Sequence, residues 1–125
     1  DDKDIVFQSD NGSGGTATYF FLDGSATQTT FQLNTRHNDS VQAKFGDGSD
    51  LKIYHDGSDS YIEHNGTGDL KIYNGTDDGD VLLRCDDGSG GVATYLTLDG
   101  SQGFTTAQKA IRFEDSVPLQ LGASN

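Results

Sequence analysis

Acidic side chains recur in this chain at spacings that would place two or three carboxylates around one cation. The candidate groups are Asp47 with Asp50, Asp56 with Asp59, and the set Asp77, Asp78 and Asp80. Calcium is the ion that such clustered oxygen ligands would suit. None of these groups has the alternating acids and distal Glu of an EF-hand loop. Solvated turns are the competing interpretation, so no cofactor is predicted and calcium remains the candidate ion.

The histidines and the cysteine are weaker candidates for chemistry. His37, His55 and His64 would bind a metal if one of them were repeated around the axis of a trimer, and surface histidines are the alternative. Cys85 has no histidine in its local sequence that would activate it, so a reactive thiol is not expected.

Tyrosines near acidic residues offer a binding function instead. Tyr54, Tyr61 and Tyr73 are candidate glycan contacts, because a tyrosine beside an aspartate can hold a sugar ring by stacking and hydrogen bonding. Tyrosine is also common in strands, which is the structural alternative.

Catalysis is not expected from this sequence. Glycoside hydrolysis needs two carboxyl groups, one of them in an apolar pocket that raises its pKa. Nearly every aspartate of this chain instead lies in a turn rich in Gly and Ser. Neither a Gly-x-Ser-x-Gly elbow nor a phosphate-binding loop is present in the sequence.

The overall charge narrows the classes of partner. The chain has 125 residues, with 8 Lys and Arg against 20 Asp and Glu, which gives a net charge of −12. Such a chain would repel nucleic acid and anionic membranes, so neither is an expected partner. No apolar run is long enough for a transmembrane span or a signal-peptide core, and a single cysteine excludes a disulfide scaffold.

An internal repeat organises the chain. A shift of 76 residues aligns 1–49 with 77–125, and 23 of the 49 aligned positions are identical. We therefore divide the chain into a partial copy at 1–49, a middle segment at 50–76 and a second partial copy at 77–125. The middle segment contains Asp-Leu-Lys-Ile-Tyr twice, at 50–54 and 69–73, and we expect two strands there. Fixed-period similarity is typical of stacked arrays; a duplicated half-domain is the alternative.

The local pattern predicts strands separated by turns. Apolar residues alternate with polar ones in several segments, which puts each set on one face of a strand. Asp-Gly-Ser and Asn-Gly sequences between the segments predict turns. The alternating sets include Val41, Ala43 and Phe45; Leu51 and Ile53; Leu70 and Ile72; Val92, Thr94, Leu96 and Leu98; Ile111 and Phe113; and Val117, Leu119 and Leu121.

These strands predict an all-β chain in which copies complete one another's core. Only 32% of the residues are hydrophobic, so a lone monomer would be marginal and self-association is expected. We expect a repetitive short-strand fibre, a trimeric shaft like a β-helix or β-prism; a single-chain β-solenoid or sandwich is the alternative. The predicted apolar seam of this shaft consists of Val41, Phe45, Leu51, Ile53, Leu70, Ile72, Val81, Leu83, Leu96, Leu98, Ile111, Phe113, Leu119 and Leu121.

The middle of the chain resembles a known family. Residues 45–62, FGDGSDLKIYHDGSDSYI, and 66–73, GTGDLKIY, are similar to a repeat of tail-fibre and related virion proteins of marine tailed phages, cyanophages among them. Residues 117–122, VPLQLG, look like the lead-in to another copy. The resemblance implies a long trimeric β-structured shaft in the virion, outside the cell, which links the particle to a host-binding tip.

The sequence therefore predicts a structural, non-enzymatic segment of a phage tail fibre or related virion fibre, with a role in host attachment. The expected partners are further copies of the chain in a homotrimer, other virion proteins and a host surface glycan. A glycan-binding adhesin module and a calcium-dependent extracellular repeat protein are the alternative functions. End-to-end stacking of the shaft into a longer filament is a further alternative.

Overall fold

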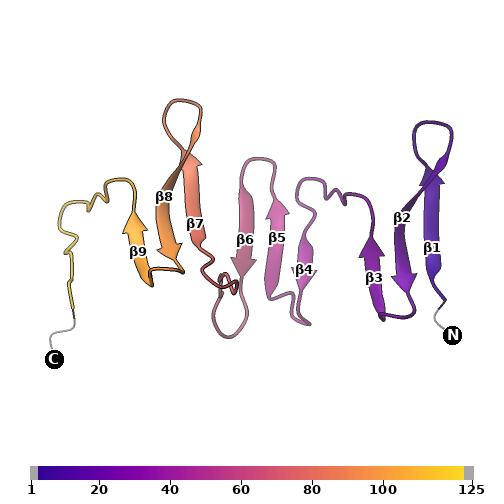
Figure 1. The fold of residues 1–125 in the computed structure, drawn as a ribbon, viewed down its shortest axis with the longest axis horizontal. Coiled ribbons are helices and arrows are strands. Elements are labelled where there is room, and N and C mark those ends of the chain that lie inside the picture. The colour runs from indigo at the N-terminus through magenta and orange to yellow at the C-terminus, as the bar shows by residue number, and fades with distance from the viewer. Residues whose placement is uncertain (1–2, 123–125) are drawn as a thin grey trace. The chain divides into compact units, whose positions relative to one another are not determined.

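The computed structural model describes residues 3–122 and confirms the all-β prediction. These residues form nine strands in three antiparallel sheets of three strands each. The chain divides into two compact units, Asp1–Asp69 and Leu70–Asn125, and each is described by itself. The first unit contains two of the sheets and the second unit contains the third (Figure 1).

The first sheet consists of β1 (Ile5–Asp10), β2 (Thr16–Asp23) and β3 (Gln28–Phe31), in that order. Ile5 pairs with Leu22 and Phe7 with Phe20 across β1 and β2, and Phe20 also pairs with Phe31 on β3. Because side chains alternate between the two faces of a strand, these five residues share one face of the sheet.

The third sheet repeats this arrangement in the second unit. It consists of β7 (Val81–Asp86), β8 (Val92–Asp99) and β9 (Phe104–Ala107). Val81 pairs with Leu98, Leu83 with Leu96, and Leu96 with Ala107. Each of these pairs lies 76 residues after its equivalent in the first sheet, so the two copies have the same register.

The second sheet has no counterpart among the described residues of the other unit. It consists of β4 (Ala43–Phe45), β5 (Leu51–His55) and β6 (Ser60–His64), with β5 in the centre. Ile53 of β5 pairs with Ala43 on one side and with Ile62 on the other.

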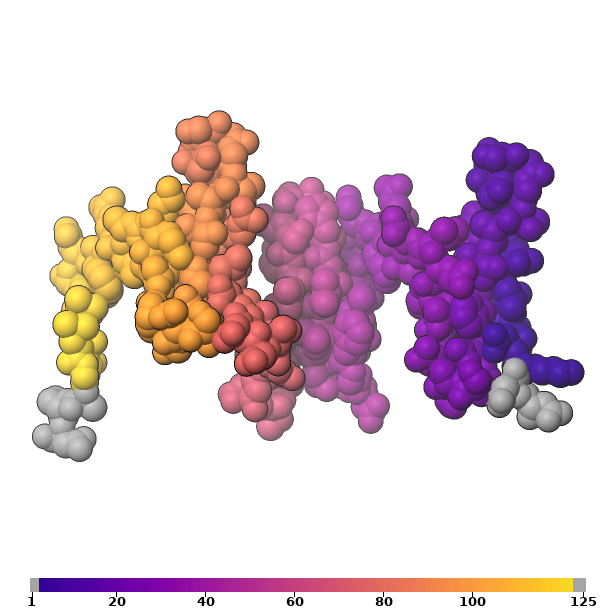
Figure 2. Space-filling view, in the orientation of Figure 1, coloured from indigo at the N-terminus to yellow at the C-terminus, as the bar shows by residue number. Residues whose placement is uncertain are grey.

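Side-chain oxygens of Asp and Asn form the turns between strands. In the β1–β2 loop, Asp10 Oδ1 accepts from the Gly12 N–H at 2.6 Å and Asn11 Oδ1 accepts from the Ser13 N–H at 2.8 Å. The β7–β8 loop forms the equivalent bonds to the Asp86 and Asp87 carboxylates. Such bonds satisfy backbone groups that would otherwise be left unpaired in a loop. Both loops extend past the third strand of their sheet (Figure 1) and project as knobs in Figure 2.

A β-bulge interrupts both long hairpins at the same place. The register shifts between Phe7 and Gln8 and again between Leu83 and Arg84, so Tyr19 and Tyr95 are the extra residues on the opposite strands. The Tyr19 hydroxyl donates to the Asp10 carbonyl at 3.0 Å, and the Tyr95 hydroxyl donates to the Asp86 carbonyl at 2.8 Å. Each tyrosine thereby fixes the loop beyond its bulge.

Because of the bulge, the predicted face of Val92 and Thr94 is wrong. Simple alternation puts Val92 and Thr94 on the same face as Leu96 and Leu98. An extra residue reverses that alternation. Thr94 pairs with Arg84, and so lies on the face opposite to Leu96.

Several predicted strands do not form in the described residues. The first Asp-Leu-Lys-Ile-Tyr sequence contains most of β5, whereas its identical second copy at 69–73 is not paired as a strand in the described residues, so the second predicted strand stays a prediction. A strand needs a partner to pair its backbone groups, and these segments have none within residues 3–122. The predicted seam residues that lie outside strands are Val41, Leu70, Ile72, Ile111, Phe113, Leu119 and Leu121.

The described residues contain no buried hydrophobic side chain. Thr97 is the one buried residue among them, at 6% exposure. Strand–strand contacts in the first unit occur only within its two sheets. Within its own unit, each sheet is therefore a single layer whose apolar side chains are not covered by another strand. Within residues 3–122 there is also no helix that could cross a membrane.

Thr27 and Gly103 provide a stability test, because they occupy equivalent turn positions with φ of 55° and 68°. A β-branched residue is strained at positive φ, whereas glycine is not. We expect Thr27→Gly to stabilise the fold by about 1 kcal/mol and Gly103→Thr to destabilise it by about as much. Urea unfolding followed by circular dichroism measures both. A destabilising Thr27→Gly change would contradict the strain assigned to this turn.

Candidate functional site

The main candidate site is an apolar face that the first and the third sheet each carry, one in each unit. We define it as Ile5, Phe7, Phe20, Leu22 and Phe31 in the first sheet, with Val81, Leu83, Leu96, Leu98 and Ala107 at the equivalent positions of the third. Most of the large side chains in both sets are exposed, Leu83 for example at 57%. A contiguous exposed apolar face of this kind is typical of an interaction surface.

Aromatic rings form the centre of this face in the first sheet. Phe7 and Phe20 stack with ring centroids 4.3 Å apart and 12° between their planes. Phe31 continues the row, with its centroid 5.7 Å from that of Phe20. This cross-strand row holds three strands together and presents one continuous apolar strip.

The second sheet has one apolar and one polar face. By the register of β4, β5 and β6, its apolar side carries Ala43, Phe45, Leu51, Ile53 and Ile62, together with the polar residues His55, Ser60 and His64. Lys44, Lys52, Tyr54, Tyr61 and Glu63 lie on the other side. All three sheets therefore carry one face that is suited to burial.

Charged and phenolic groups on the polar face form a connected cluster. Lys52 Nζ lies 2.8 Å from Glu63 Oε1, and the Tyr54 hydroxyl donates to Glu63 Oε2 at 2.7 Å. The Asn65 side-chain amide also donates to Glu63. The Tyr54 and Tyr61 rings stack at 4.8 Å, and the Tyr61 hydroxyl donates to the Asp56 carboxylate at 3.0 Å.

These contacts shift the pKa values of the cluster. The hydrogen bond to Glu63 raises the pKa of Tyr54 from 10.0 to about 12, because the phenolate would lose that bond and face a carboxylate. The bond to Asp56 likewise raises the pKa of Tyr61. The hydrogen bonds from Lys52 and then Tyr54 lower the pKa of Glu63. The cluster is thus a set of mutually satisfied groups that holds the β5–β6 hairpin.

The carboxylates predicted to bind calcium do not gather into one group. No cluster of three or more His, Cys, Asp or Glu side chains that could hold a metal occurs in residues 3–122. Asp56 Oδ1 accepts from the N–H groups of Ser58 and Asp59, and Asp80 Oδ1 accepts from that of Gly100. Calcium binding by the predicted groups, Asp47 with Asp50, Asp56 with Asp59, and Asp77, Asp78 and Asp80, stays a prediction.

The histidines and the cysteine occupy separate places. His55 Nδ1 lies 3.1 Å from Ser60 Oγ on the neighbouring strand. His64 Nε2 is buried and has no hydrogen-bond partner in the described residues. Cys85 is an exposed free thiol on β7.

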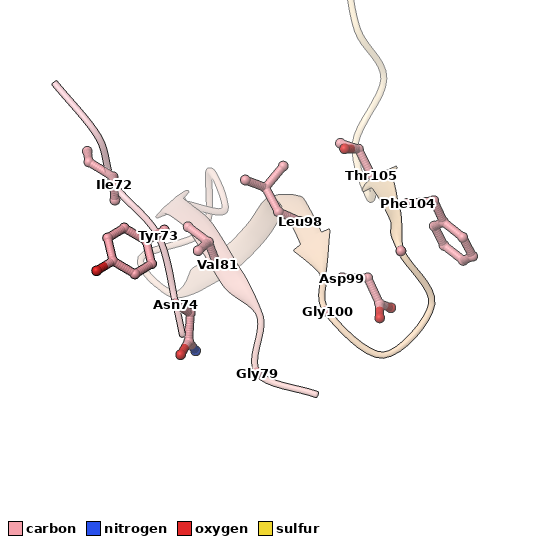
Figure 3. Close-up of a pocket in the computed structure, with 11 residues that line it drawn as sticks. Ile72, Tyr73, Asn74, Gly79, Val81, Leu98, Asp99, Gly100, Phe104 and Thr105 are labelled. Atoms are coloured by element: carbon pink, nitrogen blue, oxygen red, sulfur yellow. The ribbon is translucent and has the colours of Figure 1, made fainter. Parts of the chain in front are cut away.

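The three tyrosines predicted as glycan contacts differ in their surroundings. Tyr54 and Tyr61 stack on each other, and both of their hydroxyls are bonded to carboxylates. Tyr73 is 81% exposed and lines an open cavity of about 350 Å³ in the second unit. Figure 3 shows Ile72, Tyr73 and Asn74 along one extended segment, across this cavity from Phe104 and Thr105.

Sequence reasoning missed the apolar face of the first sheet. Tyr19, Phe20, Phe21 and Leu22 form an unbroken apolar run, so alternation does not show which of them share a face. The repeat contained the missing signal: the predicted seam residues Val81, Leu83, Leu96 and Leu98 map by the 76-residue shift onto Ile5, Phe7, Phe20 and Leu22.

The arrangement suits docking on a flat apolar surface. The apolar faces are made by regular strands and repeat with the same register, whereas the acids lie mainly in turns. Comparison of the chain with protein-family models, curated proteins and solved structures gave no match.

The Tyr54–Glu63 bond predicts how stability depends on pH. The folded pKa of Tyr54, about 12, lies above the 10.0 of a free tyrosine, so the stabilisation is complete below pH 10 and is lost as the pH rises through about 12. We expect Glu63→Gln to abolish this part of the alkaline loss and to bring the titration of one tyrosine toward pH 10. Ultraviolet titration of phenolate measures the shift, with Tyr54→Phe to identify the tyrosine. An unchanged titration in Glu63→Gln would contradict the assignment.

Proposed function

We propose that this chain is a structural, non-enzymatic segment of a phage tail fibre or related virion fibre. Its copies form a homotrimeric β-shaft that contributes to host attachment outside the cell. The other virion proteins and a host surface glycan are the partners of the whole fibre. The likeness of residues 45–62 and 66–73 to the tail-fibre repeat supports this assignment and supports three copies per shaft.

One observation carries the self-association. Every sheet has an apolar face, and no hydrophobic residue of the described chain is buried. Burial of apolar surface is the main favourable term in folding and in most protein association. A second and a third copy, each with the same faces, would bury these residues around a shared axis.

The internal repeat favours identical copies over an unrelated partner. The first and third sheets present apolar residues at equivalent positions and in the same register, so one repeating partner surface would suit both. Another copy of the chain meets this condition, because it has the same 76-residue repeat. The net charge of −12 per chain opposes this assembly, but salt screens such charges beyond about 8 Å at physiological ionic strength.

Acidic side chains in the turns support a structural rather than a catalytic role. The Ser25 hydroxyl and backbone N–H groups lower the pKa of Asp23, and the Gln102 N–H does the same for its equivalent Asp99. A carboxyl group held in its ionised form is a poor proton donor. Such groups shape turns and keep the outer surface soluble.

Two adjacent leucines provide the test of the assembly. Leu83 lies on the apolar face and is 57% exposed, whereas Leu82 points to the opposite face and is 49% exposed. We expect a molar mass of about 40 kDa, three times 13.3 kDa, for the unmodified protein by light scattering. Leu83→Ser should reduce this mass, because the loss of one buried leucine costs about 2 kcal/mol in each copy.

Leu82→Ser is the matched control and should keep the mass of the unmodified protein. A mass of 13.3 kDa for the unmodified chain, with folding intact by circular dichroism, would overturn the proposal. Equal effects of the two substitutions would place the interface on another surface.

A further inference from the structure

The second Asp-Leu-Lys-Ile-Tyr sequence, at 69–73, has the sequence of a strand but belongs to no sheet of the described residues. Its backbone forms no hydrogen bond within residues 3–122, and Ile72 is 67% exposed. The identical sequence at 50–54 contributes to the central strand of the second sheet and is paired on both sides. An extended segment with free backbone groups and apolar side chains is a template for pairing with another chain.

We propose that Leu70–Tyr73 of one copy adds as a fourth strand to the free edge of β6 in a second copy. This inference rests on the self-association proposed above and names one contact that makes it. Segment 69–73 belongs to no strand among residues 3–122, and β6 is an edge strand of its sheet. We assign the partner to a second copy because the assembly proposed above brings copies together.

The side-chain pattern of β6 fits this segment. In the second sheet, β6 places Glu63 opposite Lys52, Ile62 opposite Ile53 and Tyr61 opposite Tyr54. Because 69–73 has the same sequence as 50–54, an antiparallel pairing on the other edge would place Lys71 opposite Glu63 and Ile72 opposite Ile62. Opposite charges and apolar pairs of this kind stabilise adjacent strands.

The free edge of β6 has backbone groups available for this pairing. The Asn65 N–H donates to the Asp50 carbonyl, and the Asp56 N–H donates to that of Asp59, at the two ends of the β5–β6 ladder. Hydrogen-bonded pairs alternate in an antiparallel ladder, so Lys52 and Glu63 bond to each other and the backbone groups of Ile62 face the free edge. Ile62 is 60% exposed.

This register makes Lys71 and Glu63 a pair without backbone hydrogen bonds, in which opposing side chains are closest. A carbodiimide joins a lysine amine to a neighbouring carboxylate, so cross-linking with it would detect the Lys71–Glu63 contact directly. The experiment uses equal amounts of isotope-labelled and unlabelled full chains, refolded together, cross-linked and analysed by mass spectrometry.

We expect a Lys71–Glu63 product in which about half of the cross-linked pairs combine labelled and unlabelled peptides. The Lys52–Glu63 pair, 2.8 Å apart within one chain, is the internal control and should never combine the two. Lys71→Arg keeps the charge and should remove the Lys71–Glu63 product while the control product remains.

Three results would overturn the strand addition. A Lys71–Glu63 product without mixed isotopes would show that the pairing is within one chain. Absence of this product from an assembly of about 40 kDa would refute the strand addition and leave the proposed function standing. Its absence together with a monomeric mass of 13.3 kDa would refute both.

Discussion

Uncovered apolar surface is the constraint on which the rest of this structure depends. Each sheet is one layer thick, and alternation along its strands gathers the large side chains on one face. A single layer cannot bury that face by itself, because burial needs a second layer. Burial of the phenylalanine row of the first sheet and of the leucines of the third would therefore contribute most to the free energy of association.

Local interactions define the sheets before any such association. Asp and Asn oxygens close the turns, the bulge tyrosines Tyr19 and Tyr95 fix the long loops, and the Glu63 cluster joins β5 to β6. These contacts are hydrogen bonds and an ion pair within single turns or hairpins, so they need no apolar core. Polar contacts thus set the local structure of each sheet. We propose that a stable fold also requires other copies of the chain to cover the apolar faces.

The sequence predicted the parts of the fold that depend on local chemistry. Alternation and turn residues indicated an all-β chain and the apolar sides of β5, β7 and part of β8. The reversal at Tyr95 was not predictable from alternation, because a bulge adds one residue without a distinct local signal. The two Asp-Leu-Lys-Ile-Tyr copies show the limit most directly: identical residues form a strand at 51–54 and an unpaired segment at 70–73, because pairing depends on a partner. The backbone hydrogen bonds that Asp56 and Asp80 accept were likewise not predicted, because they depend on how the turns fold.

The dependence of thermal stability on protein concentration tests the central claim most directly. If copies bury one another's apolar faces, unfolding is coupled to dissociation, and mass action raises Tm as the concentration increases. We predict that Tm, measured by circular dichroism over a hundredfold dilution series, falls steadily on dilution. A cooperative transition with the same Tm at every concentration would show that one chain is stable alone, and would contradict the account.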